Sequence, residues 1–284
     1  MALSPDGRKA AVSCSRSNDV WLLDLASEAG SRFDTSAEPG GVAYHPDGLS
    51  IFLGEPALGS VAQVKLKELR AGRRWRSPGA PLLVEVDGSL SRLMVGTGEG
   101  GELALVRVKD LRLEKTLRLG GAPLALWTPA GRDWLALTRQ ADSVVKISSK
   151  DLNPSASLLP GLRPAGMDVD RIGSRALVAC EGAAGTWQGG GLALLRLGDF
   201  RKVDFLPVDG GPQRAYFGPG GERAWVVCAD GTLKLVSLAH GEVLGSLALG
   251  AQVGAAVPLK HGAELLLALS SQRKVLRVGL GRVP

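Results

Sequence analysis

The chain has 284 residues, of which 45% are apolar and 22% charged, and this globular composition excludes a disordered chain. Three cysteines without CxxC spacing exclude a disulfide framework, and three scattered histidines exclude most histidine-rich metal centres. The net charge of +6 gathers in one segment, and 39 glycines with 16 prolines predict many turns between short strands.

A turn glycine recurs along the chain, closing SPDG in the first repeat and HPDG in the second. The spacings between successive glycines are 41, 40, 43, 42, 48 and 41 residues, for Gly7, Gly48, Gly88, Gly131, Gly173, Gly221 and Gly262. After each glycine comes an apolar strand, then a second strand, then a weaker one before a glycine-rich loop. Four short strands in about 40 residues are typical of a β-propeller blade.

The central apolar strands are predicted, in chain order, at Ala10–Val12, Ile51–Leu53, Leu93–Val95, Leu135–Leu137, Leu177–Ala179, Trp225–Val227 and Leu265–Leu267. No segment sustains a period of 3.6 residues, so an α/β fold is excluded. We therefore predict an all-β, seven-bladed β-propeller in a single domain, with blades at about 1–41, 42–81, 82–123, 124–164, 165–212, 213–252 and 253–284. The last blade reaches only its third strand, so we expect three strands from this chain, or an upstream segment outside this sequence.

One run of sequence resembles a known repeat family. ALSPDGRKAAVSCSRSNDVWLLDLAS is similar to the YVTN-type β-propeller repeat, a relative of the cytochrome d1-type and lactonase-type seven-bladed propellers. The similarity covers nearly the whole chain, but Cys14, Cys180 and Cys228 replace the asparagine of the family in three blades. The resemblance implies a bacterial protein of the cell envelope or periplasm, whereas free cysteines and no visible signal peptide favour the cytoplasm. Its motifs are turn and strand residues, so it implies no catalytic residue.

The loops predicted at one mouth of the central channel carry both signs of charge. The blade-five repeat is about six residues longer than the others, and its glycine-rich insertion, residues 182–190, displays an indole ring. Such a loop caps the channel or grips a ligand by aromatic stacking, unless the ring folds back on the rim. Most rim charges are solvated, but binding sites commonly lie on loops over a rigid scaffold. The candidate ligand- or partner-binding residues are Trp187, Glu181, Arg139, Asp142, Arg163, Arg214 and Arg273.

A second candidate is the basic segment KLKELRAGRRWR at residues 65–76, whose net charge is +5. Tryptophan among arginines is typical of a patch that binds nucleic acid or an anionic surface. The alternative is a solvated outer strand and turn of blade two, because charge runs usually are solvated. The basic residues of this segment are Lys65, Lys67, Arg70, Arg73, Arg74 and Arg76.

No catalytic signature is present: the chain lacks CxxCH, HExxH and Gly-x-Ser-x-Gly. We expect no cofactor, no metal and no membrane span, and a binding or interaction scaffold whose channel mouth takes a protein or a small polar or anionic ligand. Two alternatives stay open. One is a lactonase-like hydrolase with carboxylates, a histidine and a cation at the mouth, and the other is nucleic-acid binding through the basic segment.

Overall fold

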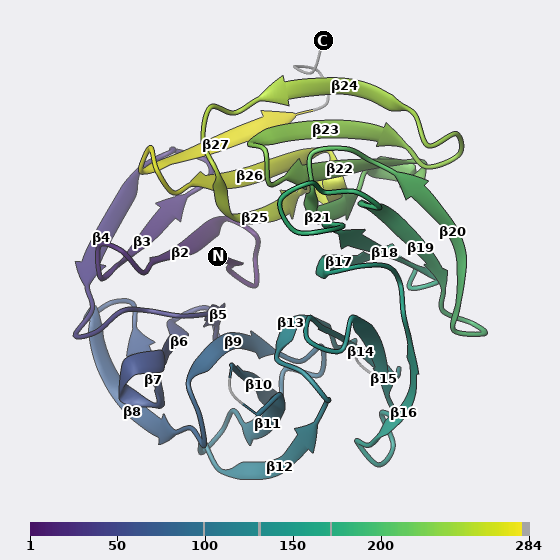
Figure 1. Cartoon of the computed structure of the whole chain (residues 1–284). Helices are drawn as coiled ribbons and strands as arrows, with labels where there is room; N and C mark the ends of the chain where they lie inside the picture. Colours follow the sequence, from purple (N-terminus) through teal and green to yellow (C-terminus); the bar gives the residue numbers. More distant parts are fainter. Residues whose placement is uncertain (99, 130–131, 171, 280–284) are drawn as a thin grey trace. The chain divides into compact units, whose positions relative to one another are not determined.

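The computed structural model describes residues 1–98, 100–129, 132–170 and 172–279 (Figure 1). Within these residues the regular structure consists of strands and three short 3-10 turns, with no α-helix. The strands form seven antiparallel sheets, six of four strands and one of three, and the chain order of the strands is also their order in each sheet. The fold is a seven-bladed β-propeller, and the predicted three-stranded last blade is confirmed.

The strands of each blade are bounded as follows. Blade one holds β1 (Ala2–Leu3), β2 (Lys9–Cys14), β3 (Asp19–Asp24) and β4 (Gly30–Asp34); blade two β5 (Val42–Tyr44), β6 (Ser50–Glu55), β7 (Ser60–Lys65) and β8 (Arg70–Arg76); blade three β9 (Pro81–Val86), β10 (Arg92–Thr97), β11 (Glu102–Arg107) and β12 (Leu113–Arg118). Blade four holds β13 (Pro123–Trp127), β14 (Trp134–Thr138), β15 (Ser143–Ile147) and β16 (Pro154–Leu158); blade five β17 (Pro164–Val169), β18 (Arg175–Cys180), β19 (Gly191–Arg196) and β20 (Arg201–Pro207). Blade six holds β21 (Pro212–Phe217), β22 (Arg223–Cys228), β23 (Thr232–Ser237) and β24 (Val243–Ala248); blade seven β25 (Val253–Leu259), β26 (Glu264–Leu269) and β27 (Lys274–Gly279).

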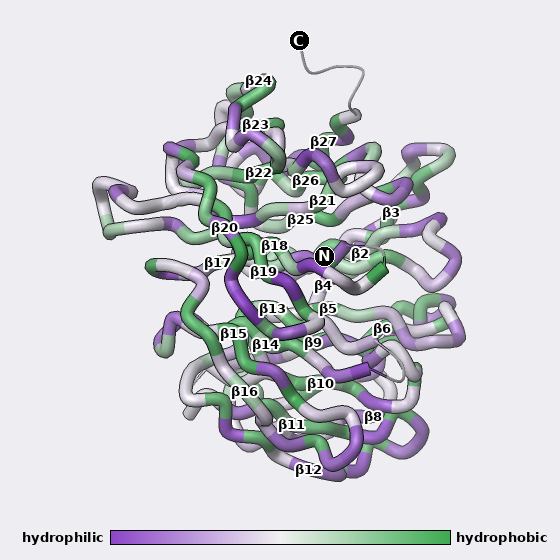
Figure 2. Tube along the Cα trace, turned by 90° about the vertical axis from the view of Figure 1, so that its right-hand side faces the viewer, coloured by the Kyte–Doolittle hydropathy of each residue, from purple (hydrophilic) through white to green (hydrophobic). Residues whose placement is uncertain are grey.

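The second strand of each blade packs on both faces. In β6 every residue is buried, and successive side chains point to opposite faces of the sheet. Ile51 therefore packs in one apolar cluster with Tyr44, and Phe52 in another with Leu93 of blade three. The fourth strands are mostly exposed, and Figure 2 shows hydrophilic residues along β8. A near-continuous apolar run in the middle of each repeat is thus the signal of a strand that is covered on both sides.

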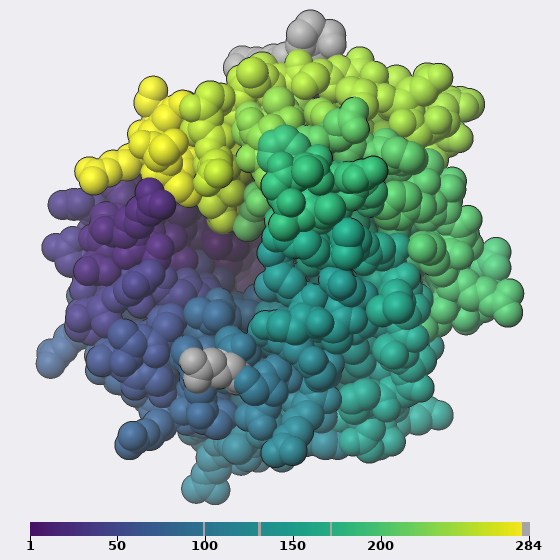
Figure 3. All heavy atoms as spheres, in the orientation of Figure 1, coloured from purple at the N-terminus to yellow at the C-terminus, as the bar shows by residue number. Residues whose placement is uncertain are grey.

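The chain divides into two compact units, Met1–Trp134 with Ile147–Pro154, and Leu135–Lys146 with Ser155–Pro284. In the second unit, polar side chains of one blade bind the backbone of the next. Asp168 accepts a hydrogen bond from the backbone N–H of Phe217 at 2.8 Å, and the Tyr216 hydroxyl donates to the Ala256 carbonyl at 2.8 Å. Blades five to seven, green to yellow, form a continuous surface in the face shown in Figure 3.

The turn of blade three closes two residues later than its glycine predicted. In blades one, two, five and six the closing glycine has positive φ and its N–H donates three residues back, as Gly7 does to Ser4 at 2.8 Å. In blade three Leu90 does this instead, with φ of 59° and a 2.8 Å hydrogen bond to the Asp87 carbonyl, and Gly88 does not have positive φ. The predicted turn glycine of blade four, Gly131, lies outside the described residues.

Candidate functional site

The loop between β18 and β19 is the longest connection between second and third strands, as predicted. It has ten residues, 181–190, whereas the equivalent loops of the other blades have three or four. The loop is closed by its own backbone: Trp187 N–H donates to the Ala183 carbonyl, and Ala183 N–H donates to the Gln188 carbonyl, both at 2.8 Å. The insertion is therefore a compact loop that holds its tryptophan at a defined place.

The indole of Trp187 lies on the backbone of blade six. A Cβ atom at Gly211 would come within 2.6 Å of Trp187 Cδ1, so only glycine allows this contact. The tryptophan is nevertheless 37% exposed. The ring thus packs on the rim, as one alternative predicted, and still offers apolar surface to a ligand.

Glu181, the first residue of this loop, is a buried carboxylate shared by two arginines. Its side chain is 7% exposed, with Arg139 Nη2 at 3.3 Å from Oε1 and Arg163 Nη2 at 2.9 Å from Oε2. The side-chain amide of Gln213 donates a third hydrogen bond to Oε1 at 3.1 Å. We call these four residues the Glu181 cluster. It joins loops of blades four and five to the first strand of blade six, β21.

The backbone around this cluster is held in an uncommon conformation. Asp142 and Arg163 have φ of 46° and 52°, in the left-handed region that non-glycine residues rarely occupy. The N–H of Arg163 donates to the Asp142 carboxylate at 3.0 Å, and the carbonyl of Arg163 accepts from the N–H of Glu181 at 3.0 Å. Asp142 therefore positions the Arg163 loop, and strain of this kind is typical of sites whose geometry is fixed by their surroundings.

Two predicted site residues do not join the cluster. The guanidinium of Arg214 donates to the carbonyls of Val253 and Gly254, at 3.3 and 2.9 Å, and so links β21 to β25. Arg273 lies in the β26–β27 loop with φ of 52° and has no contact with the cluster among the described residues. Gln213, which the sequence analysis missed, joins the cluster instead. The sequence feature that could have identified Gln213 was its position at the start of a first strand, next to the rim loops.

The residues of the basic segment have separate environments. Arg74 forms two hydrogen bonds, at 3.0 and 3.2 Å, with the buried carboxylate of Glu55, and Lys65 pairs with Glu68 at 3.4 Å. Trp75 packs against an apolar cluster that includes residues of blade three. Lys67, Arg70, Arg73 and Arg76 have no carboxylate partner in the described part of the chain. The structure thus places the segment on β7, β8 and the turn between them, with its aromatic ring turned inward.

Two carboxyl groups on first strands were also missed by sequence reasoning. Burial raises the pKa of Glu85 on β9 to about 7 and that of Asp168 on β17 to about 6. Each stands two residues before the aspartate that opens the turn of its blade, Asp87 or Asp170. In the sequence, each could have been recognised as a single acidic residue inside an otherwise apolar strand.

The remaining reactive side chains form no centre. The three cysteines are free, and burial raises the pKa of the Cys180 thiol to about 12 and that of Cys228 to about 11. His45, His240 and His261 lie in or beside turns at the opposite end of the strands from the rim loops. Across the described ranges no group of three or more His, Cys, Asp or Glu could hold a metal ion, and no helix is long and apolar enough to cross a membrane.

Comparison with known proteins supports the fold. No family model and no curated protein matches the chain. Among solved structures, Kuenenia stuttgartiensis hydrazine synthase is 13% identical, with a TM-score of 0.85 over 100% of this chain and 95% of that one. A functionally unknown protein from Desulfotomaculum acetoxidans DSM 771 is 11% identical, with a TM-score of 0.81 over 96% of this chain and 93% of that one.

A third similar structure is the dihydro-heme d1 dehydrogenase NirN in complex with DHE. It is 16% identical, with a TM-score of 0.71 over 96% of this chain and 61% of that one. All three are seven-bladed β-propellers over the matched region. At these identities the similarity shows the fold alone, because one propeller fold serves many unrelated functions.

Proposed function

We propose that the chain is a non-catalytic binding scaffold that uses the blade-five rim site, which comprises the Glu181 cluster and Trp187. Its partner is a protein or small molecule that presents an anionic group beside a flat apolar surface. The observation that carries this proposal is the buried Glu181 carboxylate, which holds two arginines at fixed positions. The propeller supplies the rigid support that such loop-borne sites need.

The arginines keep hydrogen-bonding capacity after binding Glu181. The side chains of Arg139 and Arg163 are 39% and 35% exposed, and each contacts Glu181 through Nη2. A guanidinium carries five N–H donors in a planar fork, so other donors of each group are available to a carboxylate or phosphate. Because Glu181 already orders both side chains, a ligand loses less side-chain entropy on binding them.

Trp187 supplies the apolar half of the site. Its indole rests on Gly211, and Gln213, two residues further along the chain, binds Glu181. The exposed ring and the arginines are therefore parts of one rim region. A half-exposed, rigid aromatic ring is the kind of side chain that most often provides a large share of binding free energy.

The hydrolase alternative has less support. It needs a carboxylate and a histidine that converge at the rim, yet the histidines lie at the other ends of the strands, and two arginines bind the Glu181 carboxylate. Two of the similar structures carry enzyme names, hydrazine synthase and dehydrogenase. The experiment must therefore be able to detect enzymatic activity of this chain.

The test is native mass spectrometry of the purified protein, followed by calorimetric titration with the molecule that is found bound. Trp187→Ala should weaken binding about 30-fold, as expected when an aromatic anchor worth about 2 kcal/mol is removed. Trp21→Ala is the matched control, because Trp21 in blade one is also 37% exposed, and it should bind like the wild type. Equal affinity of the Trp187→Ala variant and the wild type would refute the rim site, and chemical turnover of the bound molecule would refute the non-catalytic role.

A further inference from the structure

The positive charge of this protein is concentrated on the outer strands and turns of blades two and three. Residues 65–76 and 107–118 together hold eleven Lys or Arg against three Asp or Glu, whereas the whole chain has a net charge of +6. The rest of the chain is therefore slightly acidic. We call these two segments the basic edge. They comprise β8, β12 and the turn that precedes each, together with Lys65 and Arg107 at the ends of β7 and β11.

The two segments of the basic edge lie next to each other. Arg73 Nη1 on β8 donates to the carbonyl of Lys109, in the turn between β11 and β12, at 2.8 Å. Trp75 packs against an apolar cluster that includes Leu111 of the same turn. Figure 1 shows β8 and β12 as neighbouring outer strands, and Figure 2 shows hydrophilic residues along both. The sequence alone placed the charge of residues 65–76 on blade two and did not show that blade three extends it.

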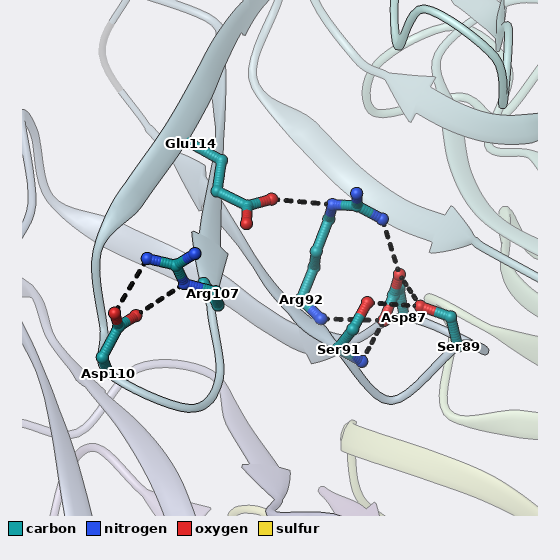
Figure 4. Close-up of polar contacts among 7 residues, drawn as sticks. All are labelled: Asp87, Ser89, Ser91, Arg92, Arg107, Asp110 and Glu114. Carbon is teal, nitrogen blue, oxygen red and sulfur yellow. Dashed lines mark hydrogen bonds and ion pairs between the residues drawn. The ribbon is translucent and has the colours of Figure 1, made fainter.

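Each acidic residue of the basic edge is already paired. Arg107 forms two hydrogen bonds of 2.8 Å with Asp110, and Glu114 accepts one of 2.9 Å from Arg92, which also pairs with Asp87 (Figure 4). Glu68 pairs with Lys65 at 3.4 Å. The edge therefore has no carboxylate left to neutralise its other cations.

Six cations of the basic edge have no carboxylate partner within the described residues. Arg73 binds the Lys109 carbonyl, and Lys115 binds the Asp151 carbonyl and the Asn153 side chain, which are neutral groups. The side chains of the other four make no hydrogen bond or ion pair with the residues that the structure describes: Lys67, Arg70, Arg76 and Lys109. A surface of this kind attracts a partner with closely spaced negative charges.

We propose that the basic edge binds the phosphate backbone of nucleic acid without reading its sequence. Arginine forks match phosphate groups, and a nucleic acid presents phosphates at short, regular intervals. Base stacking needs freely exposed aromatic rings, but Trp75 packs inward against the apolar cluster and is partly buried, so contacts go to phosphates. The same inward position removes the aromatic anchor that surface binding to a membrane commonly uses. This proposal is independent of the blade-five rim site.

The test is fluorescence anisotropy with a labelled 20-base-pair duplex of mixed sequence, in 50 and 200 mM salt. With about five phosphate contacts, affinity should fall about 500-fold between the two salt concentrations. The triple variant Arg70→Gln, Arg73→Gln, Arg76→Gln should bind at least tenfold more weakly and lower the slope of log affinity against log salt by about 3. Circular dichroism and thermal unfolding of the variant check that it is folded.

The matched control removes three charges elsewhere, by Arg196→Gln, Arg201→Gln and Lys234→Gln on blades five and six, and should keep the wild-type salt slope. The proposal is overturned if the duplex does not bind at 50 mM salt, or if the control loses as much affinity as the triple variant. Binding to vesicles that contain phosphatidylserine without binding to the duplex would instead assign an anionic membrane. Equally tight binding of polyglutamate would assign an acidic protein.

Discussion

The Glu181 cluster and the basic edge are both rich in arginine, but they differ in what their arginines face. In the cluster, two guanidinium groups share one buried carboxylate, at 2.9 and 3.3 Å. In the basic edge, six cations face no carboxylate among the described residues. A count of charges in the sequence does not separate the two cases. The buried acid fixes the arginines of the cluster and uses one nitrogen of each, whereas the six cations of the edge use none of theirs on a carboxylate in the described part of the chain.

The two regions also differ in how they connect blades. The Glu181 carboxylate binds Arg139 of the β14–β15 loop, Arg163 of the β16–β17 loop and Gln213 of β21, so one group joins blades four, five and six. In the described part of the chain, the basic edge links blades two and three through one exposed side-chain hydrogen bond, from Arg73 to the Lys109 carbonyl, and through the packing of Trp75. Exposed contacts of this kind contribute little to stability, whereas buried charge networks are costly to break.

Removing the shared carboxylate of Glu181 should therefore have the largest effect on the stability of the protein. Glu181→Ala should lower the free energy of unfolding by about 3 kcal/mol, because two arginines and Gln213 lose a common buried partner. Glu114→Ala removes a partly exposed ion pair with Arg92 from the basic-edge region and should change it by less than about 1 kcal/mol. Urea unfolding of both variants measures the difference. Similar losses in the two variants would remove the energetic distinction between the regions.

A pH dependence of stability is expected from Asp168 on β17, a partly buried acid that pairs with no cation among the described residues. Among the described residues Asp168 binds backbone N–H groups alone, and burial raises its pKa from 3.8 to about 6. Because the folded chain holds this proton more tightly than the unfolded chain, the stability from Asp168 is full below about pH 4 and is lost as pH rises to about 6. The loss should be about 2 kcal/mol, since each pKa unit corresponds to about 1.4 kcal/mol and the side chain is half-buried.

Asp168→Asn is the variant that isolates this group. The amide oxygen still accepts the hydrogen bond from Phe217 N–H, but the side chain does not titrate between pH 4 and 6. Urea unfolding at pH 4, 5, 6 and 7 should show a shallower decline in stability for the variant than for the wild type. Parallel curves would mean that Asp168 is ionised at ordinary acidic pH in the folded protein.

The fold was readable from the sequence because its signals are local. Turn glycines and buried apolar strands repeat within each blade, so seven blades and a three-stranded last sheet could be predicted without long-range information. The turn prediction failed in blade three, where Leu90 adopts the left-handed conformation and a nearby glycine, Gly88, suggested an earlier turn. A leucine with positive φ is rare enough that sequence patterns do not anticipate it.

The candidate site was readable only in part because its contacts are long-range. The unusual loop length pointed to Glu181 and Trp187, but the partners of the carboxylate come from positions 42 and 32 residues away, Arg139 and Gln213. Adjacent residues of a strand point to opposite sides, so Gln213 reaches Glu181 while Arg214 turns to β25. Which of two neighbouring polar residues enters a site depends on this alternation and on the β-bulge at Pro212–Arg214.

A smaller change in stability is expected at the contact between Trp187 and Gly211, and this change measures how rigidly the indole is held. Gly211→Ala should displace the indole and lower stability by about 1 kcal/mol more than Gly220→Ala. Both glycines have positive φ, 69° and 76°, but a Cβ atom at Gly220 would meet nothing within 4 Å, whereas at Gly211 it would meet the ring. Thermal unfolding measures stability, and near-ultraviolet circular dichroism reports the tryptophan. Identical results for the two variants would show that the indole is not held by Gly211.

The smallest effect belongs to the basic edge, where unpaired cations repel one another. Arg70→Gln with Arg76→Gln should raise stability by about 0.3 kcal/mol in 10 mM salt, because exposed like charges destabilise a fold only weakly. The gain should disappear in 500 mM salt, where charges separated by more than about 5 Å are screened. Arg107→Gln is the matched control: this arginine pairs with Asp110, so its loss should not stabilise the protein. A loss of stability in the double variant would mean that the two arginines hold the edge together, as Glu181 holds the rim, and that they are not free for a partner.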